Sequence, residues 1–271
     1  MASALPSDYG RVMPTALVTG ASTGIGAAFA RRLAADGYDL VLLARDEARL
    51  EKVAAQVRAA SGVGAQVLAV DLAQAQSRQA AIDRLTDPAQ PVDLLVNNAG
   101  VATSGEFWTV PDETLHRQLE LNVTAVMALS RAVLPGMIER GSGGVINVAS
   151  VAGLLPGRGS SYTASKAYVI SLSEGLSQGL TGTGVRVLAL CPGFVRTEFH
   201  PRAGIDMSSA PKWVWLNVDD VVAAALAGLA RDAGICIPGP LYRGLVVGAR
   251  LIPRPLARFL GSRIGNARGR T

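Results

Sequence analysis

The stretch TGASTGIG, residues 19–26, joins a short apolar run at 15–19 to a segment at 24–36 that favours a helix. Its glycines, Gly20, Gly24 and Gly26, have a G-x3-G-x-G spacing that allows a tight turn and a close approach of the backbone to a ligand. The free N–H groups and the dipole at the start of the following helix favour an anion there. Glycine-rich turns are common, but this one follows the first strand of a βαβ series. We interpret it as a turn that binds the pyrophosphate of a dinucleotide.

The same alternation of strand and helix continues along the chain. Short apolar runs predict buried strands, and longer segments between them predict helices. The predicted strands are 15–19, 39–44, 65–70, 94–97, 144–150, 185–191 and 235–237, and the predicted helices are 24–36, 46–60, 75–86, 111–140, 161–180 and 217–232. This order is typical of an α/β protein with a doubly wound parallel sheet, the Rossmann fold, with helices on both faces. We place this single domain at residues 1–240.

Composition agrees with one large buried core, since hydrophobic residues make up 49% of the 271 positions. Only two cysteines occur, Cys191 and Cys236, too few for a disulfide framework or a thiolate metal site. The first ten residues lack the charged and apolar regions of a secretion signal, and no run of about 18 apolar residues predicts a spanning helix. We therefore expect a cytoplasmic protein without a metal site.

The basic character of the chain is concentrated at its C-terminus. The net charge is +5, from 26 basic and 21 acidic residues. Residues 241–271 contain seven arginines and no acidic residue, which leaves 19 basic against 21 acidic residues, a net −2, in the remainder. Interleaved apolar residues make this a basic amphipathic C-terminal extension. It fits packing on a sister subunit, which is slightly favoured, peripheral contact with an anionic membrane, or a frayed terminus, whereas no motif for reading nucleic-acid bases is present.

The end of the second predicted strand bears on the choice of dinucleotide. An acidic residue there would bind the ribose 2′-hydroxyl of NAD(H), but the sequence LLARDEARL has Ala44 and Arg45 at this point. A guanidinium can instead pair with the 2′-phosphate of NADP(H). Asp46 fits better as the start of the next helix, and the alternative for Arg45 is a solvated surface charge. The sequence therefore favours NADP(H) over NAD(H).

Seven motifs follow one another along the chain: TGASTGIG at 19–26, VDL at 70–72, NNAG at 97–100, Asn122 in LNVTA, Ser150 in NVASVAG, YTASK at 162–166 and PGFVRT at 192–197. Each motif is weak alone, but the set is specific in its order and spacing. Over about residues 15–240 the chain resembles the short-chain dehydrogenase/reductase family, in its single-domain branch. The resemblance implies a homodimer or homotetramer that packs through two long helices.

The resemblance also implies which residues contact the dinucleotide. Asp71 would contact the adenine, Asn97 and its NNAG neighbours would border the adenosine, and Val195 with Thr197 would hold the nicotinamide carboxamide. For Asn97 and Asn98 there is an alternative, a polar turn that closes the strand through side-chain hydrogen bonds. The complete predicted set is Gly20, Ser22, Thr23, Gly24, Ile25, Gly26, Arg45, Asp71, Leu72, Asn97, Ala99, Gly100, Tyr162, Lys166, Val195 and Thr197.

The predicted catalytic residues are Asn122, Ser150, Tyr162 and Lys166. A tyrosine titrates near about pH 10, so it works as an acid or base at neutral pH only beside a positive charge that stabilises its phenolate. Lys166 lies one helical turn after Tyr162, on the same face. Ser150 would hold the substrate oxygen, and in the family the residue matching Asn122 holds a water that links the lysine to solvent. Each residue also has an ordinary structural explanation, but their joint occurrence favours catalysis.

Residues 194–216 are too many for a simple connection between a strand and a helix. We predict a loop or small helical flap over the site. Its apolar side chains would line a pocket for a lipophilic substrate, although they could equally anchor the flap to the core. These side chains are Phe194, Phe199, Ile205, Met207, Trp213, Val214 and Trp215.

The predicted function is an NADP(H)-dependent oxidoreductase that interconverts a lipophilic ketone or aldehyde and an alcohol by direct hydride transfer, with Tyr162 as general acid/base. The alternative is a non-catalytic NADP(H)-binding regulatory protein, which would not need to keep Ser150, Tyr162 and Lys166 together. A Ser–His–Asp hydrolase is a poor alternative, because the only histidines, His116 and His200, have no carboxylate pattern beside both.

Overall fold

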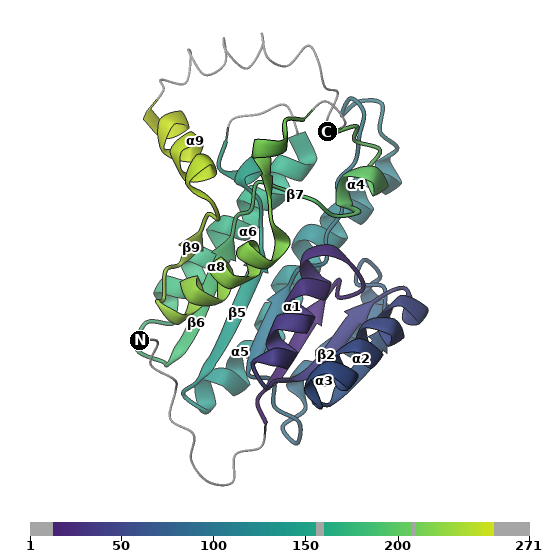
Figure 1. The fold of residues 1–271 in the computed structure, drawn as a ribbon, viewed down its shortest axis with the longest axis vertical. Helices are drawn as coiled ribbons and strands as arrows, with labels where there is room; N and C mark the ends of the chain where they lie inside the picture. The colour runs from purple at the N-terminus through teal and green to yellow at the C-terminus, as the bar shows by residue number, and fades with distance from the viewer. Residues whose placement is uncertain (1–12, 156–159, 208–209, 252–271) are drawn as a thin grey trace.

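The computed structural model describes residues 13–155, 160–207 and 210–251. Its centre is a seven-stranded parallel sheet with the order β3-β2-β1-β4-β5-β6-β9 (Figure 1). The order reverses between β1 and β4, and open α/β sheets bind ligands at the carboxyl ends of their strands at such a switch point. The strands are β1 (Thr15–Thr19), β2 (Asp39–Ala44), β3 (Ala65–Ala69), β4 (Leu94–Asn97), β5 (Gly143–Val148), β6 (Val185–Leu190) and β9 (Ile235–Cys236). The predicted doubly wound sheet is confirmed.

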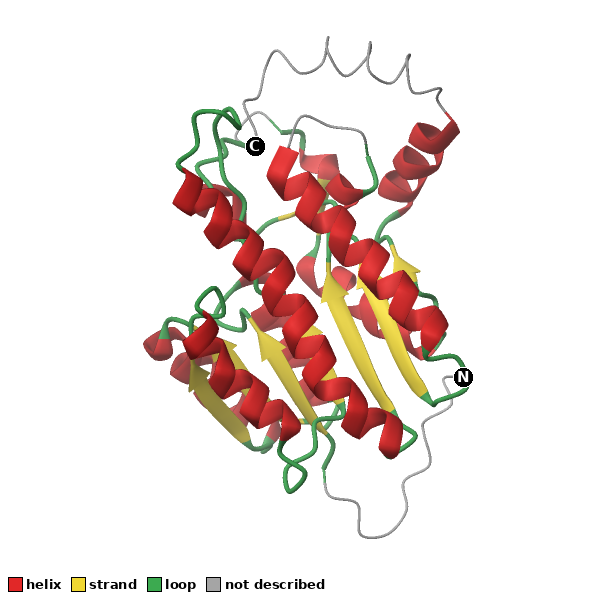
Figure 2. Cartoon of the chain, turned by 180° about the vertical axis from the view of Figure 1, so that it is seen from behind, coloured by secondary structure: helices red, strands yellow, loops and turns green. Residues whose placement is uncertain are grey.

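Helices cover both faces of the sheet (Figures 1 and 2). On one face Phe29, Leu50 and Val221 pack into a common core with the strands, and on the other Leu85 and Leu129 do so. Because both faces are buried, the strands are apolar almost throughout. The helices are α1 (Gly24–Ala35), α2 (Glu47–Ser61) and α8 (Val218–Ala230) on the first face, and α3 (Ala75–Thr86), α5 (Ala125–Glu139) and α6 (Ser160–Gly179) on the second.

The predicted long helix at 111–140 is not continuous. It consists of α4 (Asp112–Leu119), a π-helical turn η1 (Glu120–Thr124) and α5. The run 112–139 is long and apolar enough to cross a membrane by length and composition alone, but 44% of its most apolar window is buried in the protein. Leu129 and Val133 of this run lie in the core, which is typical of a core helix. The π-helical turn was not predicted, and such turns are frequent at functional sites.

The flap at 194–216 contains more regular structure than we predicted. Two short strands pair in parallel and close its base, with Phe194 opposite Trp215 and Val195 opposite Leu216. The elements are β7 (Phe194–Val195), α7 (Phe199–Arg202), the 3₁₀ turn η3 (Lys212–Val214) and β8 (Trp215–Leu216). Residues 208–209 of the flap lie outside the described residues.

The predicted C-terminal extension begins as part of the core. The helix α9 (Pro240–Leu251) follows the last strand and lies beside the flap end of the molecule (Figure 1). Tyr242 is 4% exposed; its hydroxyl accepts the N–H of Phe194 at 3.0 Å and donates to the carbonyl of Val214 at 2.6 Å. The start of α9 therefore holds both β7 and η3. Five of the seven arginines predicted for the extension lie after residue 251, outside the described residues.

Candidate active site

The glycine-rich turn joins β1 to α1 at the carboxyl edge of the sheet. Gly20 and Gly24 have φ angles of 65° and 57°, which residues with a side chain rarely adopt. A Cβ atom on Gly26 would lie 2.2 Å from the carbonyl oxygen of Gly20, so only glycine fits there. The turn has the geometry of a cradle into which a pyrophosphate fits. The predicted Ser22, Thr23 and Ile25 lie between these glycines, and Thr23 precedes the first residue of α1.

Polar side chains tie the end of β1 to the loop after β4. Thr19 Oγ1 accepts the N–H groups of Asn98 and Ala99 at 2.9 and 3.0 Å. The Asn98 amide donates to the carbonyls of Thr19 and Gly20 at 2.9 and 3.2 Å. For Asn98, the structure shows the predicted polar turn. These bonds fix the phosphate-binding turn against β4, with Ala99 and Gly100 half-buried beside it.

The side chain of Asn97 belongs to a buried polar network. It donates to Ser130 Oγ at 3.2 Å and to Asn147 Oδ1 at 2.8 Å, and Asn147 donates to Ser173 Oγ at 2.9 Å. Sequence reasoning missed Asn147 and Ser173, although an asparagine inside an apolar strand requires a buried partner. The contact of Asn97 with adenosine stays a prediction. Because the side-chain amide of Asn97 is buried in this network, only its backbone and the neighbouring residues could make that contact.

Arg45 follows the last residue of β2, at the predicted position of the cofactor ribose. Asp46 caps α2 and accepts the N–H of Arg49 at 3.0 Å through Oδ1, which confirms that this acid starts the helix. Arg45 is thus the charged side chain at the end of the strand. This position agrees with the predicted 2′-phosphate contact, which the structure does not test.

Asp71 lies beyond the end of β3, where the adenine contact is predicted. Its carboxylate accepts a hydrogen bond from Arg117 Nη2 of α4 at 2.7 Å and another from the N–H of Ala73 at 3.1 Å. Burial raises the pKa of Asp71, but these hydrogen bonds and the charges of Arg117 and Arg45 outweigh it, so the pKa lies below its ordinary value. Leu72 is 3% exposed, so its side chain belongs to the core.

Tyr162 and Lys166 lie one turn apart on α6. Lys166 Nζ lies 5.9 Å from the centre of the Tyr162 ring and donates to the carbonyl of Val148 at 2.8 Å. The Lys166 residue is only 4% exposed, and burial lowers its pKa from 10.5 to about 8. A buried cation therefore faces the phenol that is predicted to titrate.

Asn122 lies fully buried in the π-helical turn and holds the loop after β4. Its Oδ1 accepts the N–H of Val101 at 2.9 Å, and its Nδ2 donates to the carbonyl of Val101 at 2.8 Å and to Ser165 Oγ at 3.2 Å. A Cβ atom on Gly100 would lie 3.2 Å from Asn122 Oδ1 and 3.4 Å from Lys166 Nζ. The turn thus brings Asn122, the NNAG loop and Lys166 together.

Ser150 caps a short 3₁₀ helix, η2 (Val151–Gly153), and its Oγ accepts the N–H of Ala152 at 3.1 Å. The cap uses a lone pair of the hydroxyl, so its O–H can still donate to a ligand. A Cβ atom on Gly153 would lie 2.7 Å from the backbone of Lys166. Glycine therefore allows the segment that carries Ser150 to pack directly on α6, the helix of Tyr162 and Lys166.

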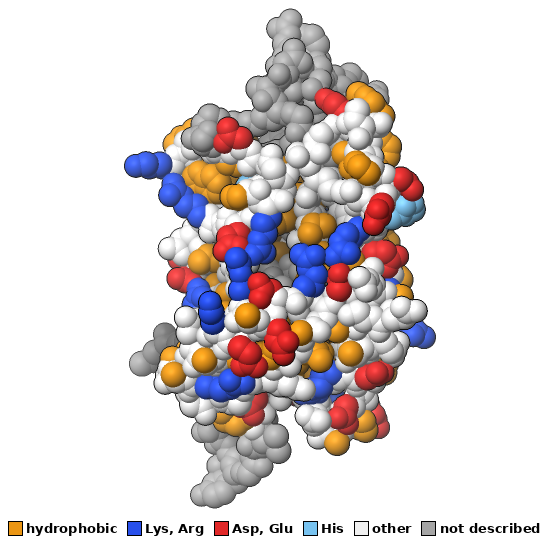
Figure 3. All heavy atoms as spheres, turned by 90° about the vertical axis from the view of Figure 1, so that its right-hand side faces the viewer, with side chains coloured by type: hydrophobic (Ala, Val, Ile, Leu, Met, Phe, Trp, Pro, Cys, Tyr) orange, Lys and Arg blue, Asp and Glu red, His pale blue; other side chains and the backbone are white. Residues whose placement is uncertain are grey.

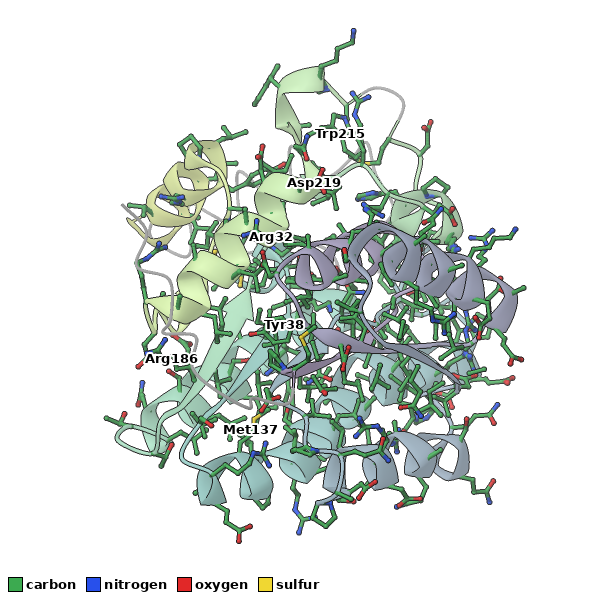
Figure 4. The ribbon with its side chains drawn as sticks, turned by 60° about the horizontal axis from the view of Figure 1, so that its bottom comes forward. Arg32, Tyr38, Met137, Arg186, Trp215 and Asp219 are labelled. Atoms are coloured by element: carbon green, nitrogen blue, oxygen red, sulfur yellow. The ribbon has the colours of Figure 1, made fainter. Side chains whose placement is uncertain are left out.

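The flap brings aromatic side chains to Tyr162. The ring centres of Tyr162 and Phe199 lie 5.9 Å apart, and Phe199 lies 5.5 Å from His200. Trp215 lies 6.0 Å from Phe194 and 5.6 Å from His200. In Figure 4, Trp215 lies at the flap end of the molecule, opposite the end marked by Met137. We name Phe194, Phe199, His200 and Trp215 the aromatic cluster.

The remaining predicted flap residues divide between the core and the surface. Met207 is 9% exposed, whereas Trp213 is 70% exposed and projects from η3. Of the two residues predicted to hold the nicotinamide, Val195 is 4% exposed. A Cβ atom on Gly24 would lie 3.0 Å from Thr197 Cγ2, so the flap begins against the phosphate-binding turn.

A cavity of about 370 Å³ lies between the loop after β4 and the end of α7. Ala102, which follows Val101 of the Asn122 pair, lines it on one side, and Ala203 lines it on the other. The cavity therefore lies beside the flap, and none of the predicted catalytic residues lines it. Its hydroxyl-bearing walls come from Thr103, Ser104, Thr109 and Thr114.

Comparisons with known proteins agree with this geometry. A family model described as short chain dehydrogenase matches residues 14–207. The ketoacyl reductase HetN of Nostoc sp. is 35% identical, over 80% of this chain and 75% of its own. A short-chain dehydrogenase from Sphingobium yanoikuyae, solved in complex with NADPH, is 40% identical with a TM-score of 0.80 over 93% of this chain and 94% of its own. A bulky-bulky ketone specific alcohol dehydrogenase from Comamonas testosteroni is 33% identical with a TM-score of 0.75 over 93% of both chains.

The chain belongs to the short-chain dehydrogenase family. The resemblance read from its seven motifs is thereby confirmed. Its class is that of an NAD(P)-dependent oxidoreductase acting on CH–OH and C=O groups.

Proposed function

We propose that this protein is an NADP(H)-dependent oxidoreductase that interconverts a bulky, lipophilic ketone or aldehyde and the corresponding alcohol. The observation that carries the proposal is the aromatic cluster, whose Phe199 ring lies 5.9 Å from the ring of Tyr162. Apolar and aromatic walls favour an apolar substrate, because they replace water at no cost in hydrogen bonds. The similarity to a bulky-bulky ketone specific alcohol dehydrogenase supports this substrate class.

Tyr162 is the proposed general acid and base. During reduction its hydroxyl donates a proton to the substrate oxygen, and during oxidation its phenolate takes that proton back. The buried cation of Lys166 stabilises the phenolate, and the O–H of Ser150 donates a hydrogen bond to the same substrate oxygen. Bound NADP(H) supplies or accepts the hydride.

Asn122 is the proposed link between Lys166 and solvent. Asn122 Oδ1 and Lys166 Nζ both lie close to the Cβ position that Gly100 leaves empty, at 3.2 and 3.4 Å. A water hydrogen-bonded to Asn122 would return the proton that Tyr162 gives up.

Arg45 supports the proposed preference for NADP(H). It stands where an acid would otherwise bind the ribose, and it lies close enough to Asp71 to affect the pKa of that carboxyl. The similarity to a dehydrogenase solved in complex with NADPH supports the same choice.

Tyr162→Phe tests the proposed acid. We expect turnover with NADPH to fall by about 1000-fold or more, within the range given by general acid–base catalysis together with its orientation, while the Kd for NADPH changes by less than about twofold. A panel of ketones of rising hydrophobicity, followed by NADPH absorbance with NADH beside it, tests the substrate and the cofactor. Full activity of Tyr162→Phe, or equal rates for small polar and large apolar ketones, would contradict the proposal.

We also propose a homodimer or homotetramer packed through α5 and α6. Met127 of α5 and Tyr168 of α6 are 43% and 39% exposed, and the Tyr168 hydroxyl donates to Met127 Sδ at 3.4 Å. A large exposed apolar surface shared by two long helices is typical of a subunit interface. Light scattering of the purified protein tests this, with Met127→Glu expected to lower the mass and Lys52→Glu on α2 as the control. A monomeric wild-type protein would contradict it.

A cytoplasmic location and peripheral membrane contact of the tail are further proposals. The free thiols of Cys191 and Cys236 support a reducing compartment. Leu245 and Val247 of α9 are 49% and 58% exposed and support contact of the tail with a membrane or a sister subunit. Cell fractionation tests the first. Co-sedimentation with anionic vesicles tests the second, with the full chain compared with a chain that ends at residue 251 and with the variant Leu245→Glu/Val247→Glu. Equal sedimentation of all three would contradict a role of the tail.

A further inference from the structure

Glu198, the first residue after Thr197, joins two arginines from different parts of the fold. Its Oε2 lies 2.8 Å from Nη1 of Arg49 on α2 and 2.5 Å from Nη2 of Arg202 on α7. Arg49 also contacts the helix-capping Asp46, with Nε 3.3 Å from Oδ2. The Arg49–Glu198 pair joins residues 149 positions apart in the sequence. The predicted catalytic chemistry uses neither residue.

The Arg49–Glu198 pair joins two segments that lie next to the predicted cofactor-binding residues. On one side, Glu198 follows Thr197, which lies against Gly24 of the phosphate-binding turn. On the other, Arg49 lies in the first turn of α2, four residues after Arg45. Figure 3 shows one face of the molecule on which Lys and Arg side chains gather with Asp and Glu in a band across the middle. A dinucleotide that extends from the turn to the end of β2 passes beneath or beside this pair.

The pair is exposed and therefore weak. The side chains of Arg49 and Glu198 are 45% and 51% exposed. Their mutual hydrogen bond raises the pKa of Arg49 and lowers that of Glu198, so both are charged at neutral pH. Exposed ion pairs contribute little, because water competes for both partners. A phosphate dianion offers a guanidinium more charge and two parallel hydrogen bonds, and so can displace the carboxylate.

We propose that Glu198 is a specificity-determining residue of the cofactor cleft, an exchangeable counter-ion that Arg49 gives up when it binds the 2′-phosphate of NADP(H). NAD(H) has a 2′-hydroxyl instead, so it leaves the Arg49–Glu198 pair in place. The work of breaking the pair therefore falls on NADP(H) alone. Glu198 therefore reduces the preference for NADP(H) over NAD(H) that Arg45 and Arg49 create. This inference rests on the proposed use of NADP(H) and adds Arg49 and Glu198 to the residues that decide the affinity.

Calorimetric titration of NADPH and NADH into the intact protein, without substrate, tests the inference. With Glu198→Gln, we expect the Kd for NADPH to fall about two- to fivefold, the scale of an exposed ion pair, and the Kd for NADH to stay within about 1.5-fold. With Arg49→Gln, we expect the Kd for NADPH to rise about tenfold and the Kd for NADH to change by less than about twofold. In the double variant, Glu198→Gln should add nothing to Arg49→Gln.

A matched control separates the pair from the general charge of the surface. Glu51 lies on the same helix as Arg49 and pairs with Arg58 at 3.5 Å, so Glu51→Gln removes the same charge without touching the Arg49–Glu198 pair. We expect this control to leave both Kd values within about 1.5-fold. If Glu51→Gln lowers the Kd for NADPH as much as Glu198→Gln does, the inference is wrong. It is also wrong if adding Glu198→Gln to Arg49→Gln still lowers the Kd for NADPH.

Weaker cofactor binding in Glu198→Gln would also decide the question. If Glu198→Gln weakens NADPH and NADH alike, the pair closes over both cofactors and the inference is wrong. Wild-type protein that binds NADH more tightly than NADPH would contradict the proposed cofactor preference instead. The two failures are distinct, because the preference is judged on the wild-type ratio of Kd values and the inference on how Glu198→Gln changes that ratio.

Discussion

The side-chain amide of Asn122 closes on both backbone groups of Val101, accepting its N–H at 2.9 Å and donating to its carbonyl at 2.8 Å. The amide therefore forms the pair of hydrogen bonds that a neighbouring strand would form, and it joins the π-helical turn to the loop after β4. Asn122 Oδ1 and Lys166 Nζ both lie close to the Cβ position of Gly100, at 3.2 and 3.4 Å, and Asn122 Nδ2 also donates to Ser165 Oγ of α6 at 3.2 Å. The Asn122 side chain thus helps to fix the NNAG loop relative to α6.

Asn122→Ala should be strongly destabilising. Two backbone groups of Val101 lose their partners in a partly buried place, and each such loss costs up to about 1–3 kcal/mol. We expect the free energy of unfolding to fall by about 2–4 kcal/mol in urea titrations, within the range for broken buried networks. Asn217→Ala is the control, because this exposed asparagine only caps α8, and its loss should cost about 1 kcal/mol. Equal losses in the two variants would contradict the role of the Asn122–Val101 contact.

Gly26→Ala should damage the phosphate-binding turn. The added methyl would lie 2.2 Å from the Gly20 carbonyl oxygen and 2.5 Å from Asn98 Nδ2, so the turn must shift away from its position against β4. We expect the Kd for NADPH, measured by titration, to rise at least about tenfold, the equivalent of about 1.4 kcal/mol. Gly175→Ala on α6 is the control, since no atom lies within 4 Å of its Cβ position. If both variants bind NADPH like the wild type, the turn does not need glycine at 26.

The buried Lys166 should make stability depend on pH in a particular direction. Its pKa of about 8 lies below the 10.5 of an exposed lysine, so between these two pH values the unfolded chain binds a proton that the native protein does not. The free energy of unfolding therefore gains up to about 1.4 kcal/mol per pH unit from this residue over that range. Below about pH 8 the lysine is charged in both states, and its burial is most costly.

Urea titrations of the wild type and Lys166→Met at pH 7.5 and pH 10 measure this dependence. We expect the stability of the wild type relative to Lys166→Met to be higher at pH 10 than at pH 7.5, because the Lys166 contribution grows as the native lysine loses its proton. A difference that stays constant or falls over this range would show that the lysine keeps an ordinary pKa.

Tyr242→Phe should loosen the flap without touching the catalytic helix. The N–H of Phe194 loses its acceptor and the carbonyl of Val214 loses its donor. We expect a loss of stability of about 1–2 kcal/mol and a severalfold rise in KM for a bulky ketone, with a smaller change in kcat. Tyr168→Phe removes a hydroxyl that only contacts Met127 and should leave both constants unchanged. A fall in kcat alone would place Tyr242 in the chemical step instead.

Features governed by local rules could be predicted from the sequence. The strands at 15–19, 39–44 and 94–97 have the predicted bounds, because continuous apolar runs between turns have few alternatives. The caps Asp46 and Asn217 were also predictable, since a short polar side chain before a helix satisfies its first N–H groups. The glycine-rich turn and the one-turn spacing of Tyr162 and Lys166 could be predicted for the same reason, since each depends only on residues close together in the sequence.

Features that depend on distant partners could not be predicted in this way. The π-helical turn has no composition of its own, and it shows itself only through the contact of Asn122 with Val101. Asn97 was assigned to the nucleotide because its motif borders the site, while its side chain is held by Asn147, 50 residues away. The parallel pairing of β7 with β8 joins two-residue strands, too short to leave a periodic signal.

The hydroxyl of Tyr242 connects helix α9 to two parts of the flap, β7 and η3. Two buried residues of α9, Tyr242 and Val246, pack in one cluster with Ala189 of β6 and Val169 of α6. Changes at Tyr242 therefore act on β7 and η3, and with them on the aromatic cluster, through contacts that do not involve Tyr162 itself. We therefore expect substitutions at the start of α9 to change which ketones the protein accepts more than they change the rate of the proposed chemical step.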